Sequence, residues 1–265
     1  MATPASTYGW DIVFATRTSV VNAGLIDPGP QPFDETVVHG GTSVHAVGST
    51  GRWQVTVGGS GALVNFSVPC TTLTLGNGDK TVQFADGQFE VQGRLELAPA
   101  VGGIQQIVIA TALGAVTVLV ASFRQPGFEA YAAYATSAFQ QWLDAQASLP
   151  YVLATVALRG PGASGLGAAL APVSASYAYA DATGGGGVLG VLGTVTDPAT
   201  SGTQLLQEVS PDAVTATDTA LLVSAAVLQQ LVDGAASAVK LPGTPGSACT
   251  VHDTVSFNVV TKGTA

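Results

Sequence analysis

The stretch of residues 36–98 decides the fold: between glycine-containing turns it carries SVHAV (43–47), RWQVTV (52–57), ALVNFSV (62–68), KTVQFA (80–85) and QFEVQGRLELA (88–98). Short runs rich in β-branched and aromatic residues, separated by turn residues, are typical of β-strands. The turn GNGDK (76–80) is a hairpin signal, because Asn-Gly favours the positive φ angles of tight hairpin turns. We therefore predict a meander of antiparallel strands.

The meander is followed by a stretch without charge. No charged residue lies between Glu96 and Arg124, and residues 107–123 are nearly all apolar. A membrane-spanning helix, which needs about 20 such residues, is one interpretation. The abundance of β-branched residues, with Gly114 and Ala115 midway, favours two strands joined by a tight turn, IQQIVIATAL (104–113) and VTVLVASF (116–123), covered on both faces. We predict no transmembrane segment.

Two segments have the pattern of amphipathic helices. The first, residues 128–147, lies between Pro126-Gly127 and Pro150, and we expect it to be the longest helix. Helical spacing places its apolar side chains on one face: Phe128, Tyr131, Ala132, Ala135, Phe139, Trp142 and Leu143. The second begins near Ser224, and one side of it carries Val227, Leu228, Leu231 and Val232.

The remaining elements are short. Residues 8–17 form a strand or the entry to a helix, and Thr18 or Ser19 can cap a short helix that stops at Pro28. A Pro-rich link then leads to the meander. Further strands are expected at residues 151–158, 173–180, 187–195, 219–223 and 250–260. Together these features predict an α+β fold, and the length of the chain allows one large domain or two small ones.

The charge of the chain excludes several functions. Lys and Arg number 8 against 17 Asp and Glu, the net charge is -9, and 9% of residues are charged, compared with about 25% in average soluble proteins. Because the basic residues are scattered singly, nucleic-acid binding and docking on an anionic membrane are excluded. We expect any ligand to be neutral or weakly anionic.

The N-terminus and the cysteines bear on location. The start MATPASTYGWD has neither a basic nor an apolar region, so no signal peptide is visible. Cys70 and Cys249 lie far apart with no CxxC pattern. They are either two buried thiols or one long-range disulfide. We predict a cytoplasmic protein.

Motifs with catalytic potential are weak. Gly160, Gly162 and Gly165 form a GxGxxG followed by Asp181, but the apolar stretch before Pro172 is too short for the crossover helix of a dinucleotide-binding unit. A glycine-rich loop between antiparallel strands is the preferred interpretation.

Metal and acid–base sites find little more support. His39, His45 and His252 lack the short ligand spacings of a zinc site. The adjacent acids Asp34 and Glu35 are expected on a solvated loop. Asp11, beside Trp10, is the best candidate for an acid with a perturbed pKa. The alternative interpretation is a carboxylate that caps a helix or stabilises a turn. We predict no catalytic residue, no metal and no cofactor.

Four stretches resemble a known family. They are YGWDIVFATRTSVVN (8–22), PYVLATVALRG (150–160), VSASYAYADATGGGGVLGVLGTVTD (173–197), and EVSPDAV with TALLVSAAVLQQLV (208–232). In this order they resemble the forty-seven-kilodalton accessory proteins of clostridial neurotoxin clusters. That family is similar to the tubular lipid-binding (TULIP) superfamily. The resemblance implies a single TULIP-like domain, residues 1–265: a strongly curved antiparallel sheet wrapped around a long amphipathic helix, with a second, C-terminal helix.

The resemblance also implies a function. We expect an apolar or lipid-like ligand in a groove between helix and sheet. The helical faces and the N-terminal motif supply the candidate ligand-binding residues: Trp10, Phe128, Tyr131, Ala135, Phe139, Trp142, Leu228 and Leu231. Two alternatives stay open. One is a biosynthetic enzyme that folds a hydrophobic intermediate in the same cavity, and the other is a subunit of a protein complex, or a homo-oligomer, without ligand.

Overall fold

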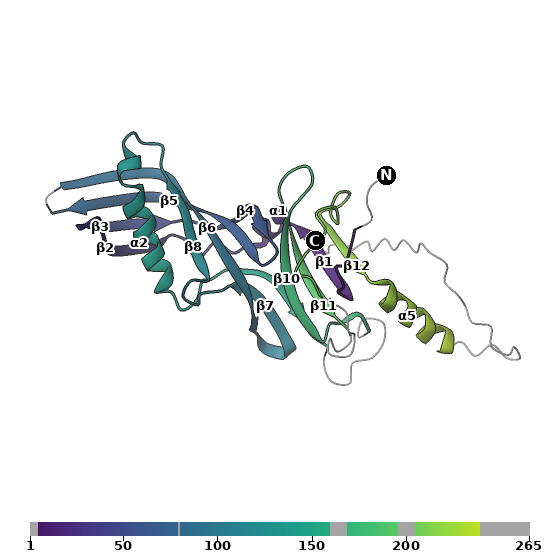
Figure 1. The fold of residues 1–265 in the computed structure, drawn as a ribbon. Coiled ribbons are helices and arrows are strands. Elements are labelled where there is room, and N and C mark those ends of the chain that lie inside the picture. The colour runs from purple at the N-terminus through teal and green to yellow at the C-terminus, as the bar shows by residue number, and fades with distance from the viewer. Residues whose placement is uncertain (1–4, 79, 160–168, 196–204, 239–265) are drawn as a thin grey trace, which may run out of the picture.

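A computed structural model describes residues 5–78, 80–159, 169–195 and 205–238, which form two antiparallel sheets and few helices (Figure 1). The α+β class and the strongly curved antiparallel sheet are confirmed. The molecule is elongated, with the longest hairpin at one end and the smaller sheet toward the other. The expected strand at residues 250–260, Cys249 and His252 lie outside the described residues.

The larger sheet has eight strands in the order β2-β3-β5-β6-β7-β9, with β4 paired to β5 and β8 paired to β6. Its strands are β2 (Gln31–His39), β3 (Thr42–Thr50), β4 (Gln54–Ser60), β5 (Leu63–Asn77), β6 (Lys80–Pro99), β7 (Ile104–Ile109), β8 (Val116–Ser122) and β9 (Val152–Ala157). The predicted meander is thus present, and it begins inside the Pro-rich segment that was expected to be a link.

The smaller sheet has four strands in the order β10-β11-β1-β12. They are β1 (Ile12–Arg17), β10 (Ser174–Asp181), β11 (Gly187–Thr194) and β12 (Thr219–Val223). β10, β11 and β12 match strands expected from the sequence, and β1 shows that the segment at residues 8–17 contains a strand rather than only the entry to a helix. The sheet joins the first strand of the chain to three strands from its last third, so its order reflects contacts that no local pattern indicates.

β6 pairs with three strands of the larger sheet, β5, β7 and β8. One edge pairs with β5 from Leu63↔Arg94 to Asn77↔Lys80. Along the other edge β8 and β7 lie end to end, both antiparallel to β6. Both expected strands and the tight turn between them are present, since Ala115 N–H donates to the Ala112 carbonyl at 2.8 Å. The two strands pair with β6, however, and not with each other. The main chain of Arg94 explains the geometry: its carbonyl accepts from Ala110 N–H at 3.0 Å and its N–H donates to the Ala115 carbonyl at 3.0 Å. The intervening residues loop out while the ladder continues.

The expectation that both faces of these strands are covered is also wrong. β8 contains an irregularity opposite Glu90 and Val91 that leaves Leu119 without a partner in β6. A bulge of this kind turns successive side chains outward, and Leu119 and Val120 are 48% and 41% exposed. None of the described helices is long and apolar enough to cross a membrane.

The first of the two predicted amphipathic helices is shorter than expected. Residues 128–147 divide into a 3₁₀ turn (Phe128–Ala130) and α2 (Ala132–Asp144), a helix of 13 residues. The helix that begins after Ser224 is confirmed as α5 (Ala225–Ala238), which has 14 residues. The first helix is therefore not the longest. The Ser224 hydroxyl accepts from Val227 N–H at 3.4 Å, which caps α5 as serine commonly does.

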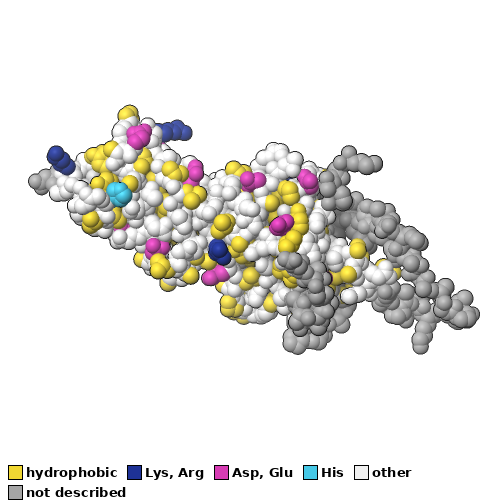
Figure 2. Space-filling view, viewed as in Figure 1, with side chains coloured by type: hydrophobic (Ala, Val, Ile, Leu, Met, Phe, Trp, Pro, Cys, Tyr) yellow, Lys and Arg dark blue, Asp and Glu magenta, His cyan; other side chains and the backbone are white. Residues whose placement is uncertain are grey.

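Two clusters of buried apolar side chains hold the molecule together. The larger joins the curled sheet to α2, and the smaller lies under the four-stranded sheet and includes Trp10, Val13 and Leu192. Outside these clusters the surface is sparsely charged, and Figure 2 shows only isolated ionisable side chains on the face in view. Burial of apolar side chains, rather than ion pairing, dominates the stabilisation of this chain.

Candidate functional site

The candidate site is the junction between α2 and the curled sheet. At this end the strand order is β2-β3-β5-β6-β8, so that β2 and β8 are the two open edges. α2 lies across the strands between these edges (Figure 1). The sequence predicts the apolar face of this helix. The structure shows in addition that the helix closes the gap between the two open edges of the curled sheet, β2 and β8.

Two neighbouring glutamines attach α2 to both edges. The side-chain amide of Gln141 donates to Glu35 of β2 at 2.6 Å. The side chain of Gln140 accepts from Val118 N–H at 2.8 Å and donates to the Val116 carbonyl at 3.0 Å. Gln140 thus imitates a neighbouring strand on the free edge of β8. Sequence reasoning missed both glutamines, because polar residues on the outer face of an amphipathic helix carry no sign of this role.

An aromatic layer lies beneath α2. Phe139 is fully buried, stacks on Phe89 with ring centres 4.2 Å apart, and is followed by Trp142 at 5.4 Å. The ring centre of Phe33 in β2 lies 5.6 Å from that of Phe139. Nearer the start of the helix, Phe128 packs on Phe84 and Phe123, and Tyr131 on Phe84. Such ring pairs are each worth about 0.5–1.5 kcal/mol beyond area burial.

The structure brings together five of the eight predicted site residues. Ala135 is fully buried, Phe128 is buried, and Tyr131 and Trp142 pack half-buried on the same cluster as Phe139. The other three lie elsewhere. Trp10 belongs to the smaller cluster and donates its indole N–H to the Leu206 carbonyl at 2.6 Å. Leu228 and Leu231 are half-buried on α5, at the opposite end of the molecule from α2 (Figure 1).

A shallow depression of about 430 Å³ lies on the outer side of α2, beside β8. It is lined by Val118, Thr136, Ser137, Gln140, Gln141 and Asp144. These side chains are mostly polar and uncharged, and the depression is widely open to solvent. The aromatic face of α2 is on the other side, packed against the sheet.

The Y-A-Y-A-D stretch fastens the two sheets together. The single proton of the Tyr179 hydroxyl is shared between the Thr56 carbonyl at 2.8 Å and the Asp181 carboxylate at 2.9 Å, and Asp181 also accepts from Gly58 N–H at 2.9 Å. The Tyr177 hydroxyl accepts from Leu95 N–H at 2.8 Å. Burial raises the pKa of both tyrosines. Asp181, the acid expected of a dinucleotide fingerprint, is therefore a structural carboxylate.

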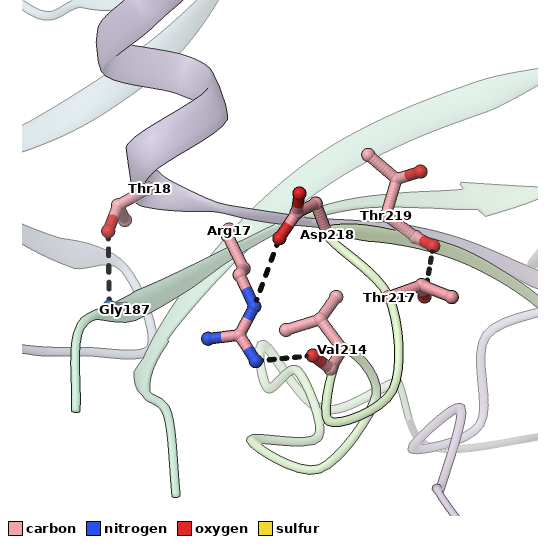
Figure 3. A network of polar contacts seen from close by, with 7 residues as sticks. All are labelled: Arg17, Thr18, Gly187, Val214, Thr217, Asp218 and Thr219. Carbon is pink, nitrogen blue, oxygen red and sulfur yellow. Dashed lines mark hydrogen bonds and ion pairs between the residues drawn. The ribbon is translucent and has the colours of Figure 1, made fainter. Parts of the chain in front are cut away.

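The other polar candidates also have structural partners. Asp34 and Glu35 lie in β2 and not on a loop; Asp34 pairs with His45 at 2.5 Å. Asp11 accepts from Val195 N–H at 2.8 Å, which ties the start of β1 to the end of β11. Thr18 does not cap α1 (Thr18–Gly24); its hydroxyl accepts from Gly187 N–H at 3.1 Å (Figure 3). The part of the chain that the structure describes contains no group of three or more His, Cys, Asp or Glu arranged to hold a metal.

Cys70 gives a testable pH dependence. Burial raises the pKa of its thiol from 9.0 to about 12. The unfolded thiol loses its proton at lower pH than the folded one, so the stability that Cys70 contributes is present below pH 9 and is lost as pH rises toward 12. In that window we expect the free energy of unfolding to fall by about 1.4 kcal/mol per pH unit from this group.

Urea denaturation between pH 8 and 11 measures this slope. The Cys70→Ala variant is the matched control, because it keeps the buried tyrosines, which titrate in the same range, and loses only the thiol. An identical alkaline slope in both proteins would show that Cys70 ionises as readily in the folded chain as in the unfolded one.

Comparison with known proteins identifies the fold. The structure of P47 from Clostridium botulinum A2 superposes with a TM-score of 0.60 at 19% identity, over 83% of this chain and 52% of that one. The crystal structure of P47 of Clostridium botulinum E1 gives a TM-score of 0.65 at 14% identity, over 86% and 54%. The chain thus spans about half the length of these structures. No curated protein sequence matches it significantly.

The sequence itself identifies the family. The family model described as OrfX-like, Protein OrfX2/OrfX3/P47, matches residues 7–239, which include all four stretches that carried the resemblance. These residues contain both sheets and all three α-helices of the described structure. The chain therefore belongs to the OrfX-like family of OrfX2, OrfX3 and P47 proteins.

Proposed function

We propose that the chain is a single TULIP-like module, residues 1–265, that binds an apolar, lipid-like molecule between α2 and the curled sheet. One observation carries the proposal: α2 closes the gap between two sheet edges, with an aromatic layer beneath it. The contacts of the helix with the sheet are apolar on its inner face, and polar anchors are confined to its outer side. Displacement of the helix from one edge exposes apolar surface without leaving a buried charge unpaired.

The energetic cost of that displacement is modest. A hydrogen bond contributes about 0.5–1.5 kcal/mol net. The side chains of Gln140 and Gln141 form three such bonds with the sheet edges, so their contribution to the free energy of the closed state is small. Displacement of the helix also exposes Phe139 and Trp142. An apolar ligand that contacts these two side chains offsets the free-energy cost of exposing them. In this proposal the packed aromatic layer is the ligand-free state of the site, and the ligand selects the open one.

The chemistry of the layer limits the ligand. Its rings come from Phe33, Phe84, Phe89, Phe123, Phe128, Tyr131, Phe139 and Trp142, so the layer is almost entirely apolar. A net charge of -9 disfavours strongly anionic molecules. Neutral acylglycerols and similar uncharged lipids fit both properties.

Mass spectrometry of an organic extract of the purified protein tests the proposal directly. We expect uncharged, acyl-containing molecules in stoichiometric amounts after expression in lipid-containing cells. An extract without such molecules, together with failure of delipidated protein to bind added acylglycerols, would contradict the proposed function.

Variants of the two glutamines test the route of entry. Replacing both Gln140 and Gln141 by alanine should raise the affinity for the neutral fluorescent probe Nile red severalfold, because less free energy holds α2 to the edges. Gln146→Ala is the matched control, since its side chain donates to the Trp142 carbonyl, four residues earlier in the chain, at 3.1 Å, and not to a sheet edge. Equal affinities in all three proteins would show that α2 does not gate the site.

A further inference from the structure

The outer edge of β12 ends the smaller sheet. The opposite end of the sheet is linked to the larger one, because Tyr179 of β10 forms an antiparallel bridge with Gly61. At the β12 end, none of the described strands continues the ladder. Among the described residues β12 is therefore an edge strand, and its outward main-chain groups face no neighbouring strand there.

The hydrogen bonds at its two ends show which groups face outward. The carbonyl of Asp218 accepts from Arg17 N–H, and Ser224 N–H donates to the Asp11 carbonyl, both at 2.8 Å. Main-chain direction alternates along a strand, so the main-chain groups of Ala220 and Leu222 face β1. Those of Thr219, Leu221 and Val223 face away from it. The Thr219 carbonyl accepts from the Thr217 hydroxyl at 2.6 Å (Figure 3).

The side chains beside this edge are apolar. Leu221 and its cross-strand partner Phe14 are 38% and 44% exposed on the same face of the sheet. β12 reads TALLV, without charge, proline or register shift. Natural proteins commonly protect edge strands with lysine, proline or a bulge, and β12 has none of these protections.

The charges nearest to the edge neutralise each other. Asp218 lies 3.5 Å from Arg17 Nε, while the same guanidinium donates to the Val214 carbonyl at 2.7 Å (Figure 3). Two chains of net charge -9 repel each other over most of their surfaces. At this edge, two copies can approach without placing like charges opposite each other.

We infer that β12 pairs with β12 of a second copy of this chain, antiparallel and centred on Leu221. The strand complements itself: Leu221 lies opposite Leu221 of the other copy, and the outward groups of Thr219 meet those of Val223. The two four-stranded sheets become one continuous sheet, on which Phe14 and Leu221 of both copies form a single apolar row. This inference goes beyond the proposed function and does not depend on a ligand.

Sedimentation velocity of the full chain tests the inference. We expect a monomer–dimer equilibrium with a micromolar dissociation constant, because the contact is smaller than the roughly 1,600 Å² of a standard stable interface. Leu221→Lys should shift the protein to monomer by placing two charges at the two-fold axis. Leu119→Lys is the matched control, since Leu119 is also an exposed strand leucine, 48% against 38% for Leu221, lies on β8, and should leave the equilibrium unchanged.

A symmetric cross-link tests the register without relying on a charged variant that could misfold. Directly opposed residues of an antiparallel pair have Cα atoms about 5.5 Å apart, within the range that a disulfide spans. Leu221→Cys in a Cys249→Ser background should therefore give a covalent dimer under mild oxidation, with Cys70 buried and unreactive.

Three results would overturn the inference. The first is a wild-type monomer at high micromolar concentration. The second is a dimer that persists in Leu221→Lys, which places the contact on another surface. The third is a monomer whose Leu221 and Val223 amides are protected from hydrogen exchange, which assigns the edge to another segment of the same chain, such as residues 250–260.

Discussion

Replacing Phe139 by alanine should lower the free energy of unfolding by about 3–5 kcal/mol, the usual loss for a large aromatic side chain in a closed core. Phe139 is fully buried and packs against Phe33, Trp53, Phe89 and Trp142. Loss of its ring leaves a cavity that the rigid sheet and α2 fill only in part. Urea denaturation followed by far-UV circular dichroism measures the change.

Trp142→Ala is the informative comparison. Trp142 is half-buried at the margin of the layer, so less of its surface is removed from water and the loss should be clearly smaller. Its removal should also change Nile red affinity severalfold, because the proposed ligand passes this margin. Equal destabilisation by the two variants, with no change in probe binding, would identify the layer as a closed core and nothing more.

Gly187→Ala should be nearly as damaging at the junction of the two sheets. A Cβ atom at this position would overlap the Tyr179 hydroxyl and lie 2.6 Å from Cζ and 2.7 Å from Cε2 of the same ring. The ring cannot move without breaking its bonds to Thr56 and Asp181. Overpacking costs about 1–3 kcal/mol, and the unpaired buried groups add about 1–3 kcal/mol.

A double-mutant cycle isolates this cause. Tyr179→Phe removes the hydroxyl, so part of the overlap disappears, and Gly187→Ala should cost less in that background than in the wild type. Gly76→Ala in β5 is the control, because the atom nearest to its Cβ lies at 3.6 Å, an ordinary contact. Strict additivity of the two changes would show that the Tyr179 hydroxyl is not what Gly187 accommodates.

Much of the fold could be predicted from local pattern. Local pattern correctly predicts the strands between residues 43 and 98 and the helix after Ser224, because alternation, turn residues and capping are properties of neighbouring residues. The predictions that are wrong concern which distant segments a strand pairs with. The two strands and the turn expected within residues 104–123 exist, but the strands do not pair with each other, because Arg94, in another strand, bonds to both ends of the connection. Asp34 and Glu35 lie in a strand because β3 pairs with them despite the preceding prolines.

The candidate site was predicted in part for the same reason. Helical spacing placed Phe128, Tyr131, Ala135, Phe139 and Trp142 on one face, and the structure packs all of them on one cluster. Spacing cannot show which end of the molecule a second helix occupies, and so Leu228 and Leu231 were grouped with residues that they do not approach. It also cannot indicate that Gln140 and Gln141 hold the helix to two sheet edges.

The central position of β1 in the smaller sheet determines the order in which the molecule can fold. Trp10, two residues before β1, bonds to a carbonyl 196 residues later in the chain, and β1 itself pairs only with β11 and β12. The β5–β6 hairpin, by contrast, pairs neighbours in sequence and can form early. At about 5–20 residues per second of synthesis, β1 waits roughly 10–40 s on the ribosome before its partners emerge. During that time β1 has neither of its partner strands, and we expect the β5–β6 hairpin to form before the smaller sheet does.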